Sequence, residues 1–236
     1  MRLINTYIGF DRDGTLEMPN VEMPDNLVTQ LQSLVQLGAR LFIASGKDYD
    51  TLIEICNKIN LNPWMICAEN GGHIVIPSEN VNYIYADQNA HLETFKHNVD
   101  LLGLPEYFQE PKLSIWSKKF GKNVLSAQEK INHFINSKNL DLQVYAYPDG
   151  DGGLDVVPVG IDKSKLMEYI PQNAVIHYFG DGSNDLGLMQ HTNVIPHTVS
   201  NAAAEVKICV KNKNGCIASF PAGVGVSELL TDLFRV

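Results

Sequence analysis

The stretch IGFDRDGTLEMP, residues 8–19, places two aspartates directly after an apolar run that predicts a buried strand. Asp11 and Asp13 are separated by one residue, and Gly14 and Thr15 follow them. A buried carboxylate without a partner is costly, and proteins normally neutralise or avoid it. The stretch therefore predicts a strand end at which a positively charged partner of these carboxylates must lie.

The first predicted strand opens a regular alternation of strands and helices. Apolar residues recur at helical spacing between Asp25, the predicted N-cap, and Gly38, the predicted end of a helix. Further buried strands are predicted at RLFIASG (40–46), at PWMICAENGG (63–72) and, much later, at AVIHYFG (174–180). Strands separated by helices in this way are typical of a parallel sheet that is covered on both faces.

The pattern changes to antiparallel α+β in the middle of the chain. Its candidate strands are VNYIYA (81–86), KLSIWSK (112–118), LQVYAYP (142–148) and GGLDVVPV (152–159), with candidate helices at His91–Leu102 and Ala127–Ser137. The turn PDGDGG joins the last two strands and predicts a hairpin. We therefore expect an α/β fold in which a Rossmann-like parallel-sheet core, 1–78 and 158–236, is interrupted by a small α+β domain, 79–157.

Composition and charge exclude several kinds of partner. The 236 residues carry a formal net charge of −9, which argues against a nucleic-acid surface or an anionic membrane surface as partner. No apolar run reaches the ~18 residues that a membrane span needs, and the N-terminus does not resemble a signal peptide, so we expect a cytoplasmic protein. The four cysteines form no CxxC pair, which favours reduced thiols.

Polar side chains follow three of the predicted core strands. In addition to the first aspartate pair, Ser45 follows the second strand, and Asp181 and Asp185 follow AVIHYFG in the motif GDGSND. Ligands of open parallel sheets bind beyond the carboxyl ends of the strands, so we expect these residues to lie together. Four carboxylates repel one another, and Mg²⁺ prefers oxygen ligands. Each motif alone also fits an ordinary turn, but the two together favour a magnesium site.

These motifs carry a resemblance to a known family. DRDGTL (11–16), ASG (44–46), DK (162–163) and GDGSND (180–185) occur in the order of the four motifs of the haloacid dehalogenase-like (HAD) phosphatases. The inserted segment lies where that superfamily carries its larger α+β caps, called type C2. AENGGHIVIP (68–77) is similar to the corresponding segment of archaeal phosphoglycolate phosphatases and mannosyl-3-phosphoglycerate phosphatases.

The resemblance covers essentially the whole chain and implies an activity. It implies a cytoplasmic, Mg²⁺-dependent phosphatase, monomeric or homodimeric, that hydrolyses the phosphomonoester of a small metabolite such as a phosphorylated acid or a sugar phosphate. A phosphomutase that uses the same nucleophile, and a non-catalytic sensor of a phosphorylated ligand or of Mg²⁺, are the alternatives.

The resemblance also implies roles for individual residues. Asp11 would be the nucleophile that forms an aspartyl-phosphate, and Asp13 the general acid and base. Ser45 would bind a phosphoryl oxygen, and Lys163 would neutralise charge on the transferring group. The implied metal ligands are Asp11, the backbone carbonyl of Asp13, Asp181 and Asp185, and the implied substrate-binding residues are Gly14, Ser45, Gly46, Asn70, Lys163 and Asn184.

Two assignments stay open at this stage. Lys165 also lies at the start of the helix after VPVGID, so it competes with Lys163 for the place of the active-site lysine, the alternative being an exposed helical lysine. The loop NGG (70–72) fits a plain hairpin turn, and in the resembling families it borders the active site.

A lysine-rich stretch in the inserted domain, KLSIWSKKFGK (112–122), supplies one more candidate for substrate binding. If it forms a strand, Lys118 shares one face with Trp116 and could bind a second anionic group or a sugar. The alternative is a solvated edge strand, since edge strands often carry lysine.

Overall fold

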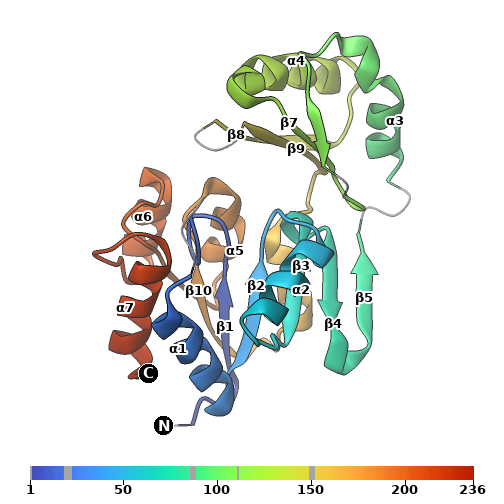
Figure 1. Cartoon of the computed structure of the whole chain (residues 1–236). Coiled ribbons are helices and arrows are strands. Elements are labelled where there is room, and N and C mark those ends of the chain that lie inside the picture. The colour runs from blue at the N-terminus through green and yellow to red at the C-terminus, as the bar shows by residue number, and fades with distance from the viewer. Residues whose placement is uncertain (1, 19–22, 86–88, 111, 149–151) are drawn as a thin grey trace. The chain divides into compact units, whose positions relative to one another are not determined.

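The computed structural model describes residues 2–18, 23–85, 89–110, 112–148 and 152–236 (Figure 1). The chain divides into two compact units, Met1–Asn82 with Asp162–Val236, here called the core, and Tyr83–Ile161, here called the cap. Both boundaries lie four residues later than those of the expected segment 79–157, at 82 instead of 78 and at 161 instead of 157.

A seven-stranded sheet forms the centre of the core, in the order β11-β10-β1-β2-β3-β4-β5 (Figure 1). The strands from β11 to β3 run parallel, and β4 pairs antiparallel with β3. The expected α/β class with a parallel-dominated sheet is confirmed. The strands are β1 (Thr6–Phe10), β2 (Arg40–Ala44), β3 (Met65–Ala68), β4 (His73–Ile76), β5 (Val81–Ile84), β10 (Val175–Phe179) and β11 (Val194–His197).

The assignment of VNYIYA to the inserted domain is wrong for its first residues. Residues 81–84 form β5, the last strand of the seven-stranded sheet, and the boundary between core and cap falls within this strand, after Asn82. All four residues of β5 are half-buried or exposed, as at the edge of a sheet. Such a pattern indicates an edge strand, but it does not indicate which sheet the strand joins.

Helices and short 3-10 helices connect the core strands. Helix α1 packs against α7, and α5 packs against α6 and against the 3-10 helix that begins at Lys163. The helices are α1 (Asp25–Gln36), α2 (Tyr49–Lys58), α5 (Leu186–Gln190), α6 (Ala204–Asn212) and α7 (Ala222–Phe234), and the 3-10 helices are Glu69–Gly71, Pro77–Glu79, Lys163–Tyr169 and Ser183–Asp185.

The first helix follows its apolar pattern closely. Its buried face carries Leu27, Leu31 and Leu34, and the chain leaves it through Gly38, whose φ of +96° favours glycine. The sequence predicted Asp25 as the N-cap of this helix, but the N-cap is Pro24. Pro24 makes no side-chain cap hydrogen bond, while Asp25 places its charge in the first turn, near the positive end of the helix dipole.

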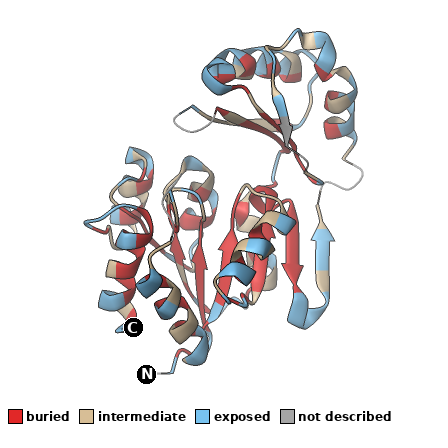
Figure 2. Ribbon diagram, viewed as in Figure 1, coloured by how far each residue is buried: buried red, intermediate tan, exposed pale blue. Residues whose placement is uncertain are grey.

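The five residues of β1 are all buried, and Figure 2 shows that the central strands of the core are buried along most of their length. The strand thus carries Asp11 out of the middle of the core to the carboxyl edge of the sheet. Strands β2 and β10, its two neighbours in the sheet, run parallel to β1 and end at the same edge. The order of the strands brings residues about 170 positions apart in sequence to one edge.

The cap is an antiparallel sheet, β6-β7-β9-β8, with two helices packed on one face (Figure 1). The predicted hairpin of β8 and β9 is present, and its turn residues 149–151 lie outside the described residues. Strand β6 was not predicted, since three residues carry too little pattern. The elements are β6 (Phe108–Glu110), β7 (Trp116–Lys119), β8 (Leu142–Tyr147), β9 (Gly153–Pro158), α3 (Ala90–Asn98), α4 (Val124–Ser137) and the 3-10 helices Val99–Leu102 and Gly121–Asn123.

The part of the chain that the structure describes contains no helix of the length and apolarity needed to cross a membrane. Cys56 and Cys67 are buried, Cys209 and Cys216 are half-buried, and all four are free thiols.

Candidate active site

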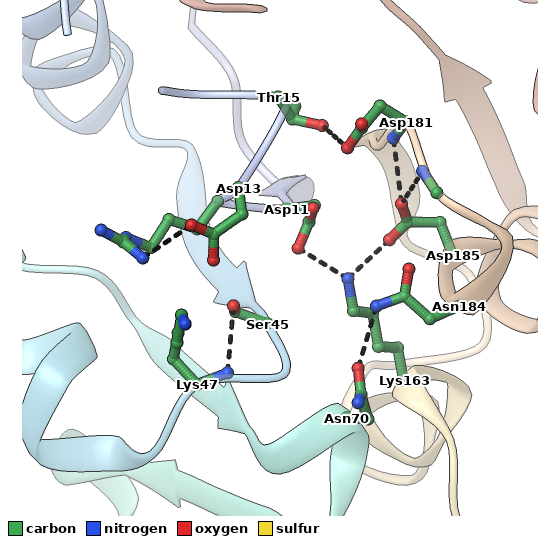
Figure 3. A network of polar contacts seen from close by, with 12 residues as sticks. Asp11, Asp13, Thr15, Ser45, Lys47, Asn70, Lys163, Asp181, Asn184 and Asp185 are labelled. Atoms are coloured by element: carbon green, nitrogen blue, oxygen red, sulfur yellow. Dashed lines mark hydrogen bonds and ion pairs between the residues drawn. The ribbon is translucent and has the colours of Figure 1, made fainter. Parts of the chain in front are cut away.

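Polar residues from three adjacent strand ends lie close together at the carboxyl edge of the core sheet (Figure 3). Asp11 follows β1, Ser45 follows β2, and the loop after β10 carries Asp181 and Asp185. The convergence predicted from the sequence is therefore present. Oxygen atoms of Asp11, Asp181 and Asp185 all lie within 4.8 Å of one another.

Lys163 lies among these carboxylates. The Nζ atom of Lys163 donates to Oδ1 of Asp11 and to Oδ1 of Asp185, both at 2.7 Å, and its side chain is fully buried. Lys165 instead pairs with Glu168 at 3.0 Å and stays 27% exposed. Lys163, and not Lys165, is therefore the lysine in this site. The side chain of Asp162 accepts a hydrogen bond from the backbone N–H of Ser164 and so caps the short helix that positions Lys163.

The carboxylate of Asp185 accepts four hydrogen bonds. Its Oδ1 accepts from Lys163 and, at 2.6 Å, from the hydroxyl of Tyr178. Its Oδ2 accepts from the backbone N–H groups of Asp181 and Gly182, both at 3.0 Å. These donors occupy all the lone pairs of Asp185 and fix its orientation. Sequence reasoning missed Tyr178, because a tyrosine inside a buried strand reads as a core residue.

Gly14 and Thr15 of the first motif contact the carboxylate of Asp181. The hydroxyl of Thr15 donates to Oδ1 of Asp181 at 2.9 Å. A Cβ atom on Gly14, whose φ is +83°, would lie 2.2 Å from Oδ2 of the same carboxylate. Glycine is therefore required at this position both for the turn and for the space that Asp181 fills. Thr15 is a further residue of the site that the sequence reasoning did not single out.

The carboxylates of the site carry more negative charge than Lys163 can neutralise. Burial, together with the charges of Asp185 and Asp181, raises the pKa of Asp11 well above its ordinary value, although Lys163 acts in the opposite direction. Burial and the charge of Asp185 raise the pKa of Asp181 to about 6. Burial alone would lower the pKa of Lys163, but Asp11 and Asp185 raise it above its ordinary value, so this lysine stays charged.

Three carboxylates thus share one ammonium group, and a hard cation would remove the excess of negative charge. Asp11 and Asp181 are the better side-chain ligands for it, because four donors already occupy Asp185. An all-oxygen donor set of this kind fits Mg²⁺.

Asp13 lies outside this cluster. Its carboxylate is 54% exposed and pairs at 2.8 Å with the guanidinium group of Arg12, which also binds Glu17 at 2.6 Å. The backbone carbonyl of Arg12 accepts from three residues of the following turn. The side chains of Asp11 and Asp13 therefore have different environments, one buried beside a lysine and the other at the surface beside an arginine.

Ser45 and Gly46 of the second motif lie beside Asn70, in the loop after β3. Ser45 is buried, and its Oγ accepts from the backbone N–H of Lys47 at 3.2 Å (Figure 3). A Cβ atom on Gly46 would lie 3.1 Å from Nδ2 of Asn70, so a larger residue would crowd this loop. The side chain of Asn70 is buried, and its backbone has the left-handed conformation. Its Oδ1 accepts a hydrogen bond from Nδ2 of Asn184 at 3.0 Å.

Both interpretations of the NGG loop therefore hold. The loop joins the antiparallel pair of β3 and β4, as a hairpin turn does. It also brings Asn70 to the site, beside the loop of the fourth motif. Gly71 is required there, since a Cβ atom on it would lie 1.9 Å from the backbone carbonyl oxygen of Asp162.

The cap lysine Lys118 does not have the surroundings that the sequence suggested. Strand β7 lies between β6 and β9, so the edge-strand interpretation is wrong. Lys118 does share a face with Trp116, but this face packs into the hydrophobic core of the cap. The Nζ atom lies 5.0 Å from the ring centroid of Tyr107 and 5.5 Å from that of Trp116, and the residue is 3% exposed. A cation–π contact inside the cap replaces the expected polar face.

Comparison with known proteins agrees with this fold. Residues 8–107 match the family model of the haloacid dehalogenase-like hydrolases. A phosphomannomutase from Triticum aestivum is 23% identical over 230 residues, which cover 85% of this chain and 92% of that protein.

Two solved structures share the whole fold. The sucrose-phosphatase of Synechocystis sp., solved with sucrose and phosphate, has a TM-score of 0.72 at 16% identity and covers 98% of each chain. A sugar phosphatase of HAD subclass IIB has a TM-score of 0.73 at 16% identity, covering 98% of this chain and 100% of the other. The resemblance found in the sequence is confirmed: this chain has the fold of a haloacid dehalogenase-like phosphatase, a Rossmann-like core with an inserted cap.

Proposed function

We propose that this protein is a Mg²⁺-dependent phosphatase that acts on the phosphomonoester of a small metabolite through an aspartyl-phosphate on Asp11. The observation that carries the proposal is the position of Asp11 at the end of a buried strand, where Lys163 binds one of its oxygens and two further carboxylates lie beside it. A nucleophilic carboxylate, a fixed cation and an acidic donor set together fit phosphoryl transfer.

In the first step, an oxygen of Asp11 attacks phosphorus and the bond from phosphorus to the leaving oxygen breaks. Asp13 gives its proton to that leaving oxygen, which departs as an alcohol. Lys163 stabilises the negative charge on the transferring group. In the structure Asp13 pairs with Arg12, so this role requires its carboxyl group to exchange Arg12 for the leaving oxygen.

In the second step, water attacks the phosphorus of the aspartyl-phosphate. Asp13, now ionised, accepts the proton of that water, and the bond between phosphorus and Asp11 breaks. The products are inorganic phosphate and the original carboxylate of Asp11. Ser45, Gly46, Asn70 and Asn184 would bind the phosphoryl oxygens and the near part of the substrate.

Asp11, Asp181 and the backbone carbonyl of Asp13 would hold the Mg²⁺ ion, with Asp185 adjacent. When bound, the ion would neutralise charge on the carboxylates and on the phosphoryl group. Phosphate monoesters are among the slowest compounds to hydrolyse without a catalyst, so the nucleophile, the acid, the lysine and the ion are all needed.

The similar proteins favour a sugar phosphate as the substrate class. The three described above are named as a sugar phosphatase, a sucrose-phosphatase and a phosphomannomutase. The sequence suggested that Lys118 could bind a second anionic group of the substrate, and the surroundings of Lys118 do not favour this, because its amine contacts aromatic rings inside the cap.

Phosphomutase activity is the second candidate function, and the curated relatives named phosphomannomutase favour it. A mutase returns the phosphoryl group of Asp11 to a sugar, whereas a phosphatase gives it to water. The two reactions use the same nucleophile and the same lysine, so the acceptor distinguishes them.

The test is a single-turnover experiment with a radiolabelled hexose phosphate, Mg²⁺ and an unlabelled hexose phosphate as acceptor. We expect a labelled phosphoenzyme that decays to inorganic phosphate, and no label in the Asp11→Asn variant. Transfer of the label to the unlabelled sugar instead of to water would establish the mutase. Binding of the hexose phosphate without any phosphoenzyme would establish a sensor and exclude both enzymes.

A further inference from the structure

Three residues lie side by side in one row across the middle of the core sheet. Gly9 of β1 is paired with Phe42 of β2 on one side and with Tyr178 of β10 on the other. Gly9 has no side chain, and the ring of Phe42 lies over it so closely that a Cβ atom there would be 1.9 Å from the ring. The glycine thus makes room for the two aromatic residues to meet across β1.

The rings of Phe42 and Tyr178 stack on each other over this gap. Their centroids are 6.0 Å apart and their planes differ by 3°. Both residues are completely buried. A stacked, buried ring has little rotational freedom, so the hydroxyl group of Tyr178 is held at one place.

That place is the carboxylate of Asp185. The hydroxyl donates to Oδ1 of Asp185 at 2.6 Å, and the same oxygen accepts from Nζ of Lys163 at 2.7 Å. Burial and the charge of Asp185 raise the pKa of Tyr178 well above its ordinary value, so the hydroxyl keeps the proton that it donates. Two strong donors therefore share one carboxylate oxygen, and Lys163 also donates a hydrogen bond to Asp11.

We propose that Tyr178 is a positioning residue for phosphoryl transfer: its hydroxyl takes up part of the accepting capacity of Asp185, so that Lys163 remains directed at Asp11. Without this hydroxyl, Lys163 would be the one side-chain donor to Oδ1 of Asp185 among the residues that the structure describes, and this oxygen would draw the ammonium group away from Asp11. Loss of the hydroxyl would weaken the stabilisation of the charge that develops on the transferring group, and it would leave the binding of the substrate unchanged. This proposal rests on the proposed function, because it assigns a task to Lys163 in that reaction.

The variant that tests the proposal is Tyr178→Phe, which keeps the stacked ring and removes only the hydroxyl. Tyr7→Phe is the matched control. Tyr7 is also buried in a core strand, and its hydroxyl accepts from Arg40, a residue at the start of β2 and not at the site. Both variants delete one hydrogen-bonded hydroxyl group from the same sheet, so a general loss of packing would affect them alike.

We expect kcat of Tyr178→Phe to fall about tenfold, which is about 1.4 kcal/mol of transition-state stabilisation, with KM within a factor of two of the wild type. Inhibition by orthovanadate, which imitates the transferring group, should weaken by a similar factor, while inhibition by inorganic phosphate should not change. Tyr7→Phe should leave all four quantities unchanged. Active enzyme is counted by phosphoenzyme formation, so a partly unfolded preparation is corrected for.

Three kinetic results would overturn the proposal. These are an unchanged kcat in Tyr178→Phe, a loss of kcat without any loss of vanadate affinity, and an equal loss in Tyr7→Phe. The wild-type protein is measured first, so that failure of the proposed function is seen separately as the absence of turnover and of phosphoenzyme. The ¹⁵N resonance of the Lys163 ammonium group gives a readout that needs no turnover: it should move in Tyr178→Phe and not in Tyr7→Phe, and an unmoved resonance would also overturn the proposal.

Discussion

The Nζ atom of Lys163 lies 2.7 Å from Oδ1 of Asp11, although 152 residues separate the two in sequence. Both side chains are buried at the carboxyl edge of the core sheet. This contact distinguishes Lys163, the residue preferred from the sequence, from Lys165, which the sequence left as an alternative. It also determines the first prediction.

Replacing Lys163 with Met should lower kcat on p-nitrophenyl phosphate at least about 100-fold, because the transferring charge loses its fixed cation. Lys165→Met is the matched control. Its amine is partly exposed and pairs with Glu168, so we expect its kcat to stay within about twofold of the wild type. Steady-state kinetics of both variants, with circular dichroism to confirm folding, decide the matter. The reverse order of the two effects would reject Lys163 as the active-site lysine.

Replacing Asp13 with Asn should lower kcat by about 10²–10⁴-fold for an alkyl phosphate such as a sugar phosphate, because the leaving alkoxide then receives no proton. Release of p-nitrophenol in the first turnover should be affected much less, since that leaving group needs little protonation. The melting temperature should stay within a few degrees of the wild-type value, because the side chain of Asp13 is 54% exposed. Equal kcat values for wild type and variant on the alkyl phosphate would contradict the acid and base role.

Replacing Gly9 with Ala should destabilise the protein by about 1–3 kcal/mol, the usual cost of overpacking a core. The new Cβ atom would lie 1.9 Å from the ring of Phe42. Urea unfolding of Gly9→Ala, Phe42→Leu and the double variant gives the coupling between the two positions. The double variant should lose less stability than the sum of the single variants. Strict additivity would show that the ring of Phe42 does not limit the space above Gly9.

The stability of the protein should fall in acid through two paired histidines, the half-buried His177 and the buried His197. His177 and His197 lie with their ring nitrogens 2.9 Å apart, and the backbone N–H of Cys216 donates to Nδ1 of His197. Burial lowers the pKa of His177 from 6.5 to about 4, and burial together with His177 lowers that of His197 to about 3. Between pH 6.5 and 4 the unfolded chain therefore binds protons that the folded chain does not, so stability is lost as the pH falls.

The measurement is the free energy of unfolding from pH 7 to pH 4.5 for the wild type and for His177→Leu. Each such histidine contributes about 1.4 kcal/mol per pH unit in this window, and we expect the variant to lose stability less steeply by about that amount. The raised pKa values of Asp11 and Asp181 act in the opposite direction, but they are common to both proteins. Identical slopes would show that His177 takes up protons in the folded protein as easily as in the unfolded one.

Most of the core fold could be predicted because its signals are local. An apolar run such as that of β1, a helical repeat such as that of α1, and the aspartates that follow a strand are each visible within about a dozen residues. The parallel order then brings Asp11, Ser45 and Asp181 to the same edge. The sheet to which VNYIYA belongs was not predictable, because its half-exposed pattern suits the edge of either sheet.

The sequence by itself determined the α/β class, the inserted domain and the acidic motifs, since these depend on periodicity and on the order of motifs along the chain. Only the tertiary structure decided between Lys163 and Lys165, placed Lys118 on the aromatic rings of the cap, and joined Tyr178 to Asp185. The physical reason is that hydrogen bonds and ion pairs between residues distant in sequence depend on register and side-chain direction. These are properties of the packed chain, and no stretch of sequence contains them.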